Sequence, residues 1–284
     1  MPAPGSTLPP DAFSDDSWRA FFSPYAHLVL IANSDEVDMT SLQERFGEGT
    51  LFIFFNKVYK VLDGTFDRPA LLASRSGMMG ANIVHRREAA DVIGHFTLSS
   101  FQGVLNITIG NDERFSAAAE FGGAPVAHLD LDPVVSGFYP PRMVPTTGFG
   151  LCLWLNRLAL PASITLAGFS SRRSARWKVF DIHDWTFEQV VLRLLFRKGE
   201  IDILGRDRAD PYAALSRHFP QFSSAEISST TDDVLSERLS GVSRMVDHLM
   251  SVTKPLRFLD ESFRKIRPKT RKQKFLQRQG KDKP

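Results

Sequence analysis

The sequence of 284 residues contains a single cysteine, Cys152. One thiol excludes an intrachain disulfide framework and a thiolate metal site, because each needs at least two cysteines. Cys152 lies within the apolar stretch GFGLCLWL, so we expect a buried thiol with a packing role. The scarcity of cysteine suits a reducing environment, and we expect a cytoplasmic protein.

Long hydrophobic runs are also missing. No uninterrupted apolar segment reaches the roughly 18 residues that a membrane-spanning helix requires. The first residues, MPAPGSTLPPDAFSDD, are rich in proline and acidic residues, whereas a secretory signal is basic and then apolar. We therefore expect neither a membrane span nor a signal peptide.

The sequence lacks the common cofactor motifs as well. Neither G-x-G-x-x-G nor a phosphate loop ending in Gly-Lys-Ser/Thr occurs, which disfavours dinucleotide and ATP chemistry. The histidines and aspartates show no metal-ligand spacing. These residues include Asp112, Asp130, Asp132, His85, His95 and His128. We expect no metal and no other cofactor.

Charge is distributed unevenly along the chain. Residues 264–284 carry ten Lys or Arg and one Asp, a net charge of +9, so the formal total of +3 leaves −6 for the remainder. An acidic body disfavours binding of nucleic acid through the fold. The basic tail suits either an anionic membrane surface or a solvated, disordered terminus. Apolar residues precede it, at Leu256, Phe258, Leu259, Phe263 and Ile266.

Short apolar runs rich in β-branched or aromatic residues recur along the chain. They occupy residues 27–32, 50–55, 70–74, 104–109 and 163–168. Continuous apolar character predicts strands covered on both faces, hence an α/β fold with a mainly parallel sheet flanked by helices. We expect one Rossmann-like domain over 21–259, a disordered N-terminal tail over 1–20 and a basic C-terminal tail over 260–284.

The stretch DIHDWTFEQVV places a histidine before an amphipathic segment. Apolar residues at helical spacing predict a helix over about 185–198, with one buried face formed by Phe187, Val190, Val191, Leu194 and Leu195. Asp184 suits the N-cap and Gly199 the left-handed residue after the end. His183 thus precedes a helix N-terminus, where the helix dipole favours the neutral imidazole. It is a candidate general base, or alternatively a residue that caps and packs.

Two further segments carry polar residues where ligands commonly bind. Thr146, Thr147 and Gly148 precede an apolar, helix-like run, and hydroxyls with free N–H groups at a helix start can bind an anion or can simply cap the helix. Asn33, Ser34 and Asn56 follow the first two predicted strands, at the sheet edge where open α/β folds bind ligands. The asparagines also suit turns.

The order and spacing of these segments resemble the sialyltransferase family, glycosyltransferase family 29, with a looser likeness to the bacterial sialyltransferases of family 42. LVLIANSDEVDM and LFIFFNK look like the family's large motif, and VPTTGFGLCLWLNRLALPASITLAGF is similar to its small motif. HDWTFE, from His183 to Glu188, matches the very small motif, a histidine followed by four residues and a glutamate. The likeness covers roughly residues 27–200.

The resemblance implies a metal-independent, inverting transfer of a sugar from a CMP-activated donor to the hydroxyl of a glycan or glycolipid. In that scheme His183 is the general base, and Glu188 supports the start of its helix. The donor would be bound by Asn33, Ser34, Asn56, Thr146, Thr147 and Gly148. The motifs are compatible with both sialic acid and the related 2-keto acid Kdo.

The sequence also departs from the family. Ala32 replaces the glycine that usually precedes the first asparagine, and the usual His or Tyr upstream of His183 is missing. The basic segment SSRRSARWKVFD lies there instead, so Arg176 or Lys178 would contact the leaving phosphate or the acceptor. These departures keep two alternatives open: a non-catalytic nucleotide- or glycan-binding protein on the same scaffold, and a hydrolase that splits CMP-sugars. A transferase of surface glycans would work at the inner membrane face, held there by the basic tail.

Overall fold

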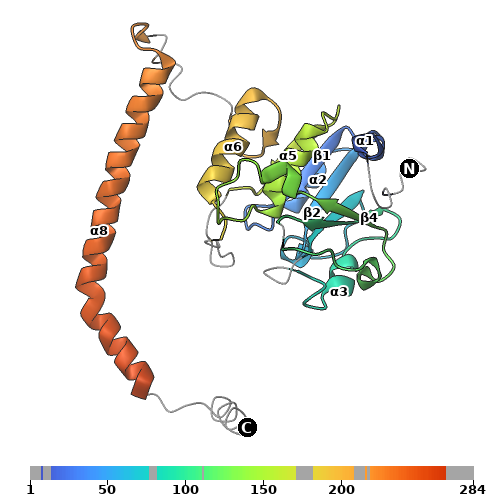
Figure 1. Cartoon of the computed structure of the whole chain (residues 1–284), viewed down its shortest axis with the longest axis horizontal. Helices are drawn as coiled ribbons and strands as arrows, with labels where there is room; N and C mark the ends of the chain where they lie inside the picture. The colour runs from blue at the N-terminus through green and yellow to red at the C-terminus, as the bar shows by residue number, and fades with distance from the viewer. Residues whose placement is uncertain are drawn as a thin grey trace. The chain divides into compact units, whose positions relative to one another are not determined.

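The computed structural model describes residues 8, 14–76, 82–110, 112–170, 182–207, 215 and 218–266. For 247–250 and 252–266 it describes the backbone alone. The chain divides into two compact units, Met1–Arg208 and Ala209–Pro284. Figure 1 shows the helices and strands of both units.

The first unit is built on one seven-stranded sheet in which every pairing is parallel. The strand order is β5-β4-β3-β2-β1-β6-β7. The strands are β1 (His27–Ile31), β2 (Thr50–Phe55), β3 (Ala70–Arg75), β4 (Phe101–Thr108), β5 (Val126–Asp130), β6 (Ser163–Ala167) and β7 (Asp202–Ile203). The predicted parallel α/β, Rossmann-like fold is confirmed, and all five predicted strands are present. The sequence pattern missed β5 and β7.

Helices cover both faces of this sheet. They are α1 (Asp15–Phe22), α2 (Met39–Arg45), α3 (Ala89–Ile93), α4 (Asp132–Val135), α5 (Thr147–Arg157) and α6 (Trp185–Lys198), with short 3-10 helices η1 (Val58–Lys60) and η2 (Ala118–Phe121). Successive strand residues point to opposite faces, so Leu28 and Leu30 pack with α1, α5 and α6, while Val29 and Ile31 pack with α2 and α3. Two apolar cores result, one on each side of the sheet.

The N-terminal segment contains a helix where the sequence pattern predicted a disordered tail over 1–20. The Ser14 side chain accepts a hydrogen bond from the Ser17 N–H and caps α1. Trp18 is 3% exposed and packs edge to face on Trp154 of α5, with ring centroids 5.1 Å apart. The prediction is wrong for residues 14–20 because Trp18, Phe21 and Phe22 form one apolar face that closes the core. Leu8 is buried as well.

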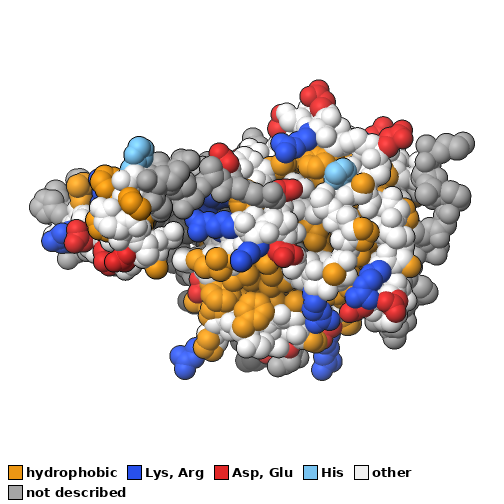
Figure 2. All heavy atoms as spheres, turned by 90° about the horizontal axis from the view of Figure 1, so that it is seen from above, with side chains coloured by type: hydrophobic (Ala, Val, Ile, Leu, Met, Phe, Trp, Pro, Cys, Tyr) orange, Lys and Arg blue, Asp and Glu red, His pale blue; other side chains and the backbone are white. Residues whose placement is uncertain are grey.

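Helix α6 has the predicted bounds and caps, and Phe187, Val191 and Leu195 of its predicted face pack against the core. Asp184 Oδ1 accepts a hydrogen bond from the Phe187 N–H at 2.9 Å, and Gly199 is left-handed with φ of 82°. Leu192 and Phe196 are buried, whereas Val190 and Leu194 are exposed. The prediction is wrong for Val190 and Leu194, because the centre of the buried face lies toward Glu188, Leu192 and Phe196. Hydrophobic side chains gather on the face of the molecule drawn in Figure 2.

The second unit contains α8 (Ser224–Ile266), a helix of 43 residues. The prediction of one domain over 21–259 is therefore wrong, since the sheet domain ends near residue 208. No linker-like composition marks this boundary, which is why the sequence pattern did not reveal it. Helix α8 includes residues 260–266 of the predicted C-terminal tail, and 267–284 lie outside the described residues. Among the helices described, none is both long enough and apolar enough to cross a membrane.

We predict that Trp18→Ala lowers the free energy of unfolding of the sheet unit by about 3–5 kcal/mol, because it leaves a cavity against Trp154. Urea denaturation followed by fluorescence measures the change. Leu98→Ala is the matched control, since Leu98 is 93% exposed, and we expect it to change stability by less than about 0.5 kcal/mol. Equal stability of the two variants would mean that residues 14–20 do not belong to the folded domain.

Candidate active site

The topology of the sheet locates the first candidate region. Strands β1 to β5 follow one another toward one edge of the sheet, whereas β6 lies on the other side of β1. The strand order therefore reverses between β1 and β6, and ligands of open α/β folds bind outside the carboxyl ends of the strands at such a point. Helices α5 and α6 each lead into the next strand, β6 and β7, so their N-termini lie at the same end of the sheet.

His183 stands immediately before α6 with a defined tautomer. Its Nδ1 lies 2.5 Å from the Val144 carbonyl oxygen. A carbonyl can only accept a hydrogen bond, so Nδ1 carries the proton and Nε2 keeps its lone pair. No described residue contacts Nε2 through a hydrogen bond. The ring also packs edge to face on Trp185, with centroids 5.3 Å apart.

The surroundings of His183 favour the neutral imidazole. Burial lowers the pKa of the ring, and the positive charge of Arg75 lowers it further, while the hydrogen bond to Val144 acts in the opposite direction. The Val144 N–H donates to the Ile182 carbonyl at 2.9 Å, so the segment before α5 and the start of α6 are paired in both directions. His183 is thus a neutral imidazole whose orientation is fixed and whose Nε2 can accept a proton.

Glu188 joins the first turns of the same two helices. Its side chain is 3% exposed, yet its carboxylate accepts three hydrogen bonds. The Thr146 N–H donates to Oε1 at 2.7 Å, the Thr146 hydroxyl to Oε2 at 2.6 Å and the Tyr139 hydroxyl to Oε1 at 2.8 Å. Burial raises the pKa of this carboxyl, and the hydrogen bonds from Thr146 and Tyr139 partly offset that increase. Glu188 thus connects the segment before α5 with the first turn of α6.

Tyr139 is a member of the site that the sequence pattern did not reveal. Its hydroxyl donates to Glu188 and accepts a hydrogen bond from the Asp184 N–H at 3.1 Å. Burial, followed by the nearby charge of Glu188, raises the pKa of the phenol, so the hydroxyl keeps its proton. A lone tyrosine between α4 and α5 carries no local signal, because its partners lie 45 and 49 residues away.

Arg75, at the end of β3, was also missed. Its Nε donates to both Glu113 carboxylate oxygens, at 2.9 and 3.1 Å, and its two terminal nitrogens donate to the carbonyls of Pro145 (2.8 Å) and Ile109 (3.0 Å). The guanidinium is therefore committed to the protein, and it ties the tip of β3 to the residue before Thr146. A charged residue directly after a buried strand was the available sequence signal.

The two asparagines lie on neighbouring strand tips, as predicted, and both make structural contacts. Asn33 Nδ2 donates to the Phe55 carbonyl at 2.8 Å, and Asn56 Oδ1 accepts from the Arg75 N–H at 3.1 Å. Together they connect β1 to β2 and β2 to β3. Asn33 Oδ1 is buried and has no hydrogen-bond partner in the described part of the chain, so it remains available to a donor. Ser34 accepts from the Glu36 N–H within a turn.

The predicted anion site at the start of α5 is partly occupied by the protein itself. The Thr146 hydroxyl donates to Glu188 and accepts from the Phe149 N–H, so it has no hydrogen left to donate to an anion. A Cβ at Gly148 would lie 2.6 Å from Cε1 of the Phe169 ring, so packing explains this glycine. Within the ranges described, the Thr147 hydroxyl and the N–H groups of Thr147 and Gly148 make no hydrogen bond to another residue. These groups remain for a ligand.

A pocket of about 430 Å³ lies at the strand-order reversal, next to α2 and the carboxyl ends of β6 and β7. It is lined by the turn after β1, by α2 and by the segments after β6 and β7, including Gly168, Phe169 and Ser170. Phe169 connects it to α5 through Gly148 and to α6 through Gln189, whose Nε2 donates to the Phe169 carbonyl at 3.0 Å. His183 does not line the pocket. Arg176 and Lys178 belong to 171–181, the stretch between Ser170 and Ile182 that lies outside the described residues.

Two further expectations concern metals and the thiol. The described residues contain no group of three or more His, Cys, Asp or Glu that could hold a metal ion. Cys152 is buried, as predicted, and burial raises its pKa to about 12, so the thiol is protonated at neutral pH and unsuited to act as a nucleophile.

Comparison with known proteins identifies no relative of the chain. No protein-family model, no curated protein and no solved structure matches the chain. The geometry of the site therefore has to carry the functional argument.

We predict that Glu188→Gln lowers the free energy of unfolding by about 1–3 kcal/mol, because the amide NH₂ faces groups that donate hydrogen bonds and leaves one of them unpaired. Urea denaturation at neutral pH measures the loss. Glu44→Gln removes an exposed carboxylate and should change stability by less than about 0.5 kcal/mol. A loss no larger than that of Glu44→Gln would contradict the bridging role.

We also predict that His183 makes stability depend on pH. Because its pKa is lowered in the folded state, the unfolded chain binds this proton first as pH falls below 6.5, and stability is lost down to the folded pKa. His183→Asn keeps a donor for the Val144 carbonyl but cannot titrate. The free energy of unfolding of wild type minus that of the variant should therefore decrease as pH falls below 6.5, measured over about pH 5 to 8. His85→Asn is the control for an exposed histidine, and parallel curves for wild type and His183→Asn would refute the prediction.

Proposed function

We propose that the chain is a metal-independent, inverting glycosyltransferase of the sialyltransferase type. It moves a 2-keto sugar acid, sialic acid or Kdo, from a CMP-activated donor to a hydroxyl of a glycan or glycolipid. The observation that carries the proposal is the hydrogen bond from His183 Nδ1 to the Val144 carbonyl, which leaves the lone pair on Nε2, a nitrogen that no residue in the described part of the chain hydrogen-bonds. This ring lies beside the start of α5, where the second family-like motif begins.

In the proposed reaction His183 is the general base. The acceptor hydroxyl gives its proton to Nε2 while its oxygen forms a bond to the anomeric carbon of the donor sugar. The bond from that carbon to the phosphate oxygen breaks, and CMP leaves with the electron pair. Attack from the face opposite the phosphate inverts the anomeric configuration. A lowered pKa suits the role, because the imidazole must be unprotonated before each turnover.

Negative charge on the leaving phosphate needs donors in place of a metal. The N–H groups of Thr147 and Gly148 and the Thr147 hydroxyl, which have no hydrogen-bond partner among the described residues, offer them at the start of an 11-residue helix. Asn33 Oδ1, which has no partner in the described part of the chain, is an acceptor suited to a nucleotide amino or hydroxyl group. Arg176 and Lys178 are further proposed phosphate or acceptor contacts and lie outside the described residues.

A second candidate is a non-catalytic binding protein on the same scaffold. This alternative is supported by the contacts that several predicted donor-binding groups make within the protein. These groups are the Thr146 hydroxyl, the Asn33 and Asn56 side-chain amides, and Gly148. A hydrolase of CMP-sugars is the third, and it would differ in needing no acceptor. We also propose that the basic tail over 267–284 places the protein at an anionic inner membrane face, from its charge in the sequence.

Calorimetric titration with CMP, CDP, UDP, GDP and AMP, with and without EDTA, tests the proposal. We expect selective CMP binding that EDTA does not change. His183→Asn should keep CMP affinity and lower transfer by about 10²–10⁴-fold, whereas His85→Asn should affect neither. Preference for UDP with a metal would refute the assignment.

The same assay separates the alternatives. CMP binding with no turnover on any acceptor supports the binding protein, and CMP release at an undiminished rate without acceptor supports the hydrolase. Transfer that requires an acceptor and His183 supports the glycosyltransferase.

A further inference from the structure

Helix α8 carries a long apolar stripe on its sequence. Five apolar residues follow one another at intervals of seven: Leu235, Val242, Leu249, Leu256 and Phe263. The residues three positions after the last four of them, 245, 252, 259 and 266, are apolar as well. These nine residues are called the α8 stripe below. Apolar residues at alternating three- and four-residue spacing over more than four heptads are typical of helices that pack along one another.

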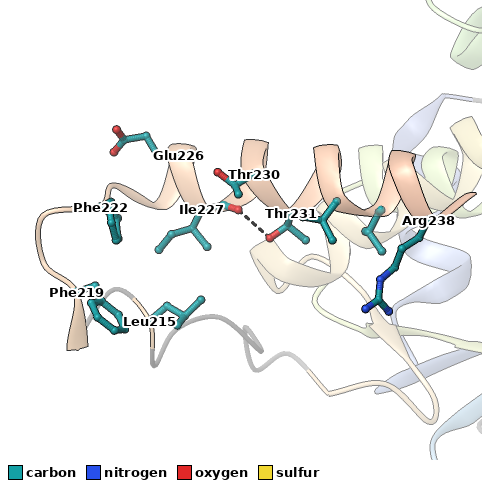
Figure 3. A pocket seen from close by; sticks show the side chains of 10 residues that line it. Leu215, Phe219, Phe222, Glu226, Ile227, Thr230, Thr231 and Arg238 are labelled. Atoms are coloured by element: carbon teal, nitrogen blue, oxygen red, sulfur yellow. Dashed lines mark hydrogen bonds between the residues drawn. The ribbon is translucent and has the colours of Figure 1, made fainter. Parts of the chain in front are cut away.

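The described part of the stripe is exposed to solvent. Val242 is 57% exposed and Met245 is 72% exposed, and Leu239 beside them is 69% exposed. Upstream, Leu215, Phe219 and Phe222 lie opposite the first turns of α8 and enclose a pocket of about 610 Å³ with it (Figure 3). That pocket reaches no further along α8 than Arg238. Beyond that pocket, Leu239, Val242 and Met245 expose apolar surface to solvent.

The period of the stripe selects the kind of partner. An α-helix has 3.6 residues per turn, so a strict seven-residue repeat shifts by about 20° per heptad and by about 80° over the four intervals from Leu235 to Phe263. If a straight helix lay on a flat surface, successive residues of the stripe would point further and further away from that surface. A second helix that supercoils around it stays in contact along its whole length. The repeat therefore favours a helical partner over a membrane surface.

The charges along α8 select the orientation. Residues 224–237 contain four acidic residues and no basic one, whereas 254–266 contain four basic residues and two acidic ones. In an antiparallel pair the acidic end of one copy lies along the basic end of the other. A parallel pair would bring like charges together, and an anionic membrane would repel the acidic end. A second copy of α8 is thus complementary to the first in both shape and charge.

The area is sufficient for a stable pair. A buried aliphatic side chain removes on the order of 100 Å² of apolar surface from water. Nine stripe positions then bury about 900 Å² per copy, close to the ~800 Å² per partner of a standard stable interface.

We propose that α8 is a dimerisation helix, which pairs antiparallel with α8 of a second copy of the chain through the α8 stripe. The pairing is independent of the proposed catalytic function. The pairing would bury the exposed apolar residues of α8. It would also place the acidic end of each copy beside the basic end of the other, so that the two copies attract each other.

Size-exclusion chromatography with light scattering on the full chain tests the pairing. We expect wild type at twice the mass of the 31.8 kDa chain. Leu239→Glu with Val242→Glu should run as a monomer, while Ser240→Glu with Ser243→Glu adds the same charge on other positions of the same turns and should remain a dimer. Thermal unfolding of the sheet unit should be the same in both variants, which shows that they fold.

Disulfide capture tests the orientation. In a Cys152→Ser background, one batch carries Val242→Cys, and a second, with a mass tag, carries Leu259→Cys, the stripe position that lies opposite residue 242 in an antiparallel pair. Antiparallel pairing predicts disulfide-linked dimers of mixed mass after the batches are combined, and same-batch dimers would overturn it in favour of parallel pairing.

A monomeric wild type, or a dimer that survives the paired glutamates, would overturn the proposal. Sedimentation with anionic phosphatidylserine vesicles identifies the competing occupant. A wild-type monomer that pellets with these vesicles, and a glutamate pair that does not, would assign the stripe to the membrane. If pelleting requires residues 267–284 and is unchanged by the paired glutamates, the tail binds the membrane and the stripe remains assigned to the second copy.

Discussion

The buried carboxylate of Glu188 is the interaction on which the candidate site depends. A charged group at this depth is costly unless donors surround it, and Thr146 and Tyr139 supply three hydrogen bonds. Those bonds fix the first turn of α6 against the first turn of α5. His183 precedes that turn, and the pairing of Val144 with Ile182 then determines where its ring lies and which nitrogen holds the proton. Glu188 thus helps to fix the two segments whose pairing orients the proposed base.

A second constraint joins this pair of helices to the sheet. Arg75 extends from β3 to the Pro145 carbonyl and is itself fixed by Glu113. The amides of Asn33 and Asn56 continue the connection across the tips of β1 and β2. Because these contacts involve buried or half-buried groups with defined directions, the sheet edge and the two helix starts form one arrangement. Arg75 also lowers the pKa of His183 through its charge, so the structural contact has an electrostatic effect on the proposed base.

The two units of the chain obtain their stability in different ways. The sheet unit buries apolar side chains on both faces of a parallel sheet, which makes its strands almost entirely apolar. Helix α8 leaves apolar residues such as Leu239 and Met245 exposed, and its acidic and basic ends are separated along its length. Surface of this kind is stabilised by association rather than by folding of one chain alone. A dimerisation helix would place two copies of the sheet unit in one particle.

Local patterns in the sequence determined the strands at residues 27–32 and 50–55, the parallel sheet, and the bounds and caps of α6, because each depends on neighbouring residues. They also indicated His183 and Glu188, whose spacing is local. Tertiary structure alone decided the rest: the partners of Tyr139, Thr146 and Arg75 lie tens of residues away in the chain, and no local period encodes such contacts. The exposure of Val190 and Leu194 was decided in the same way, since the centre of the buried face of α6 lies toward Glu188, Leu192 and Phe196.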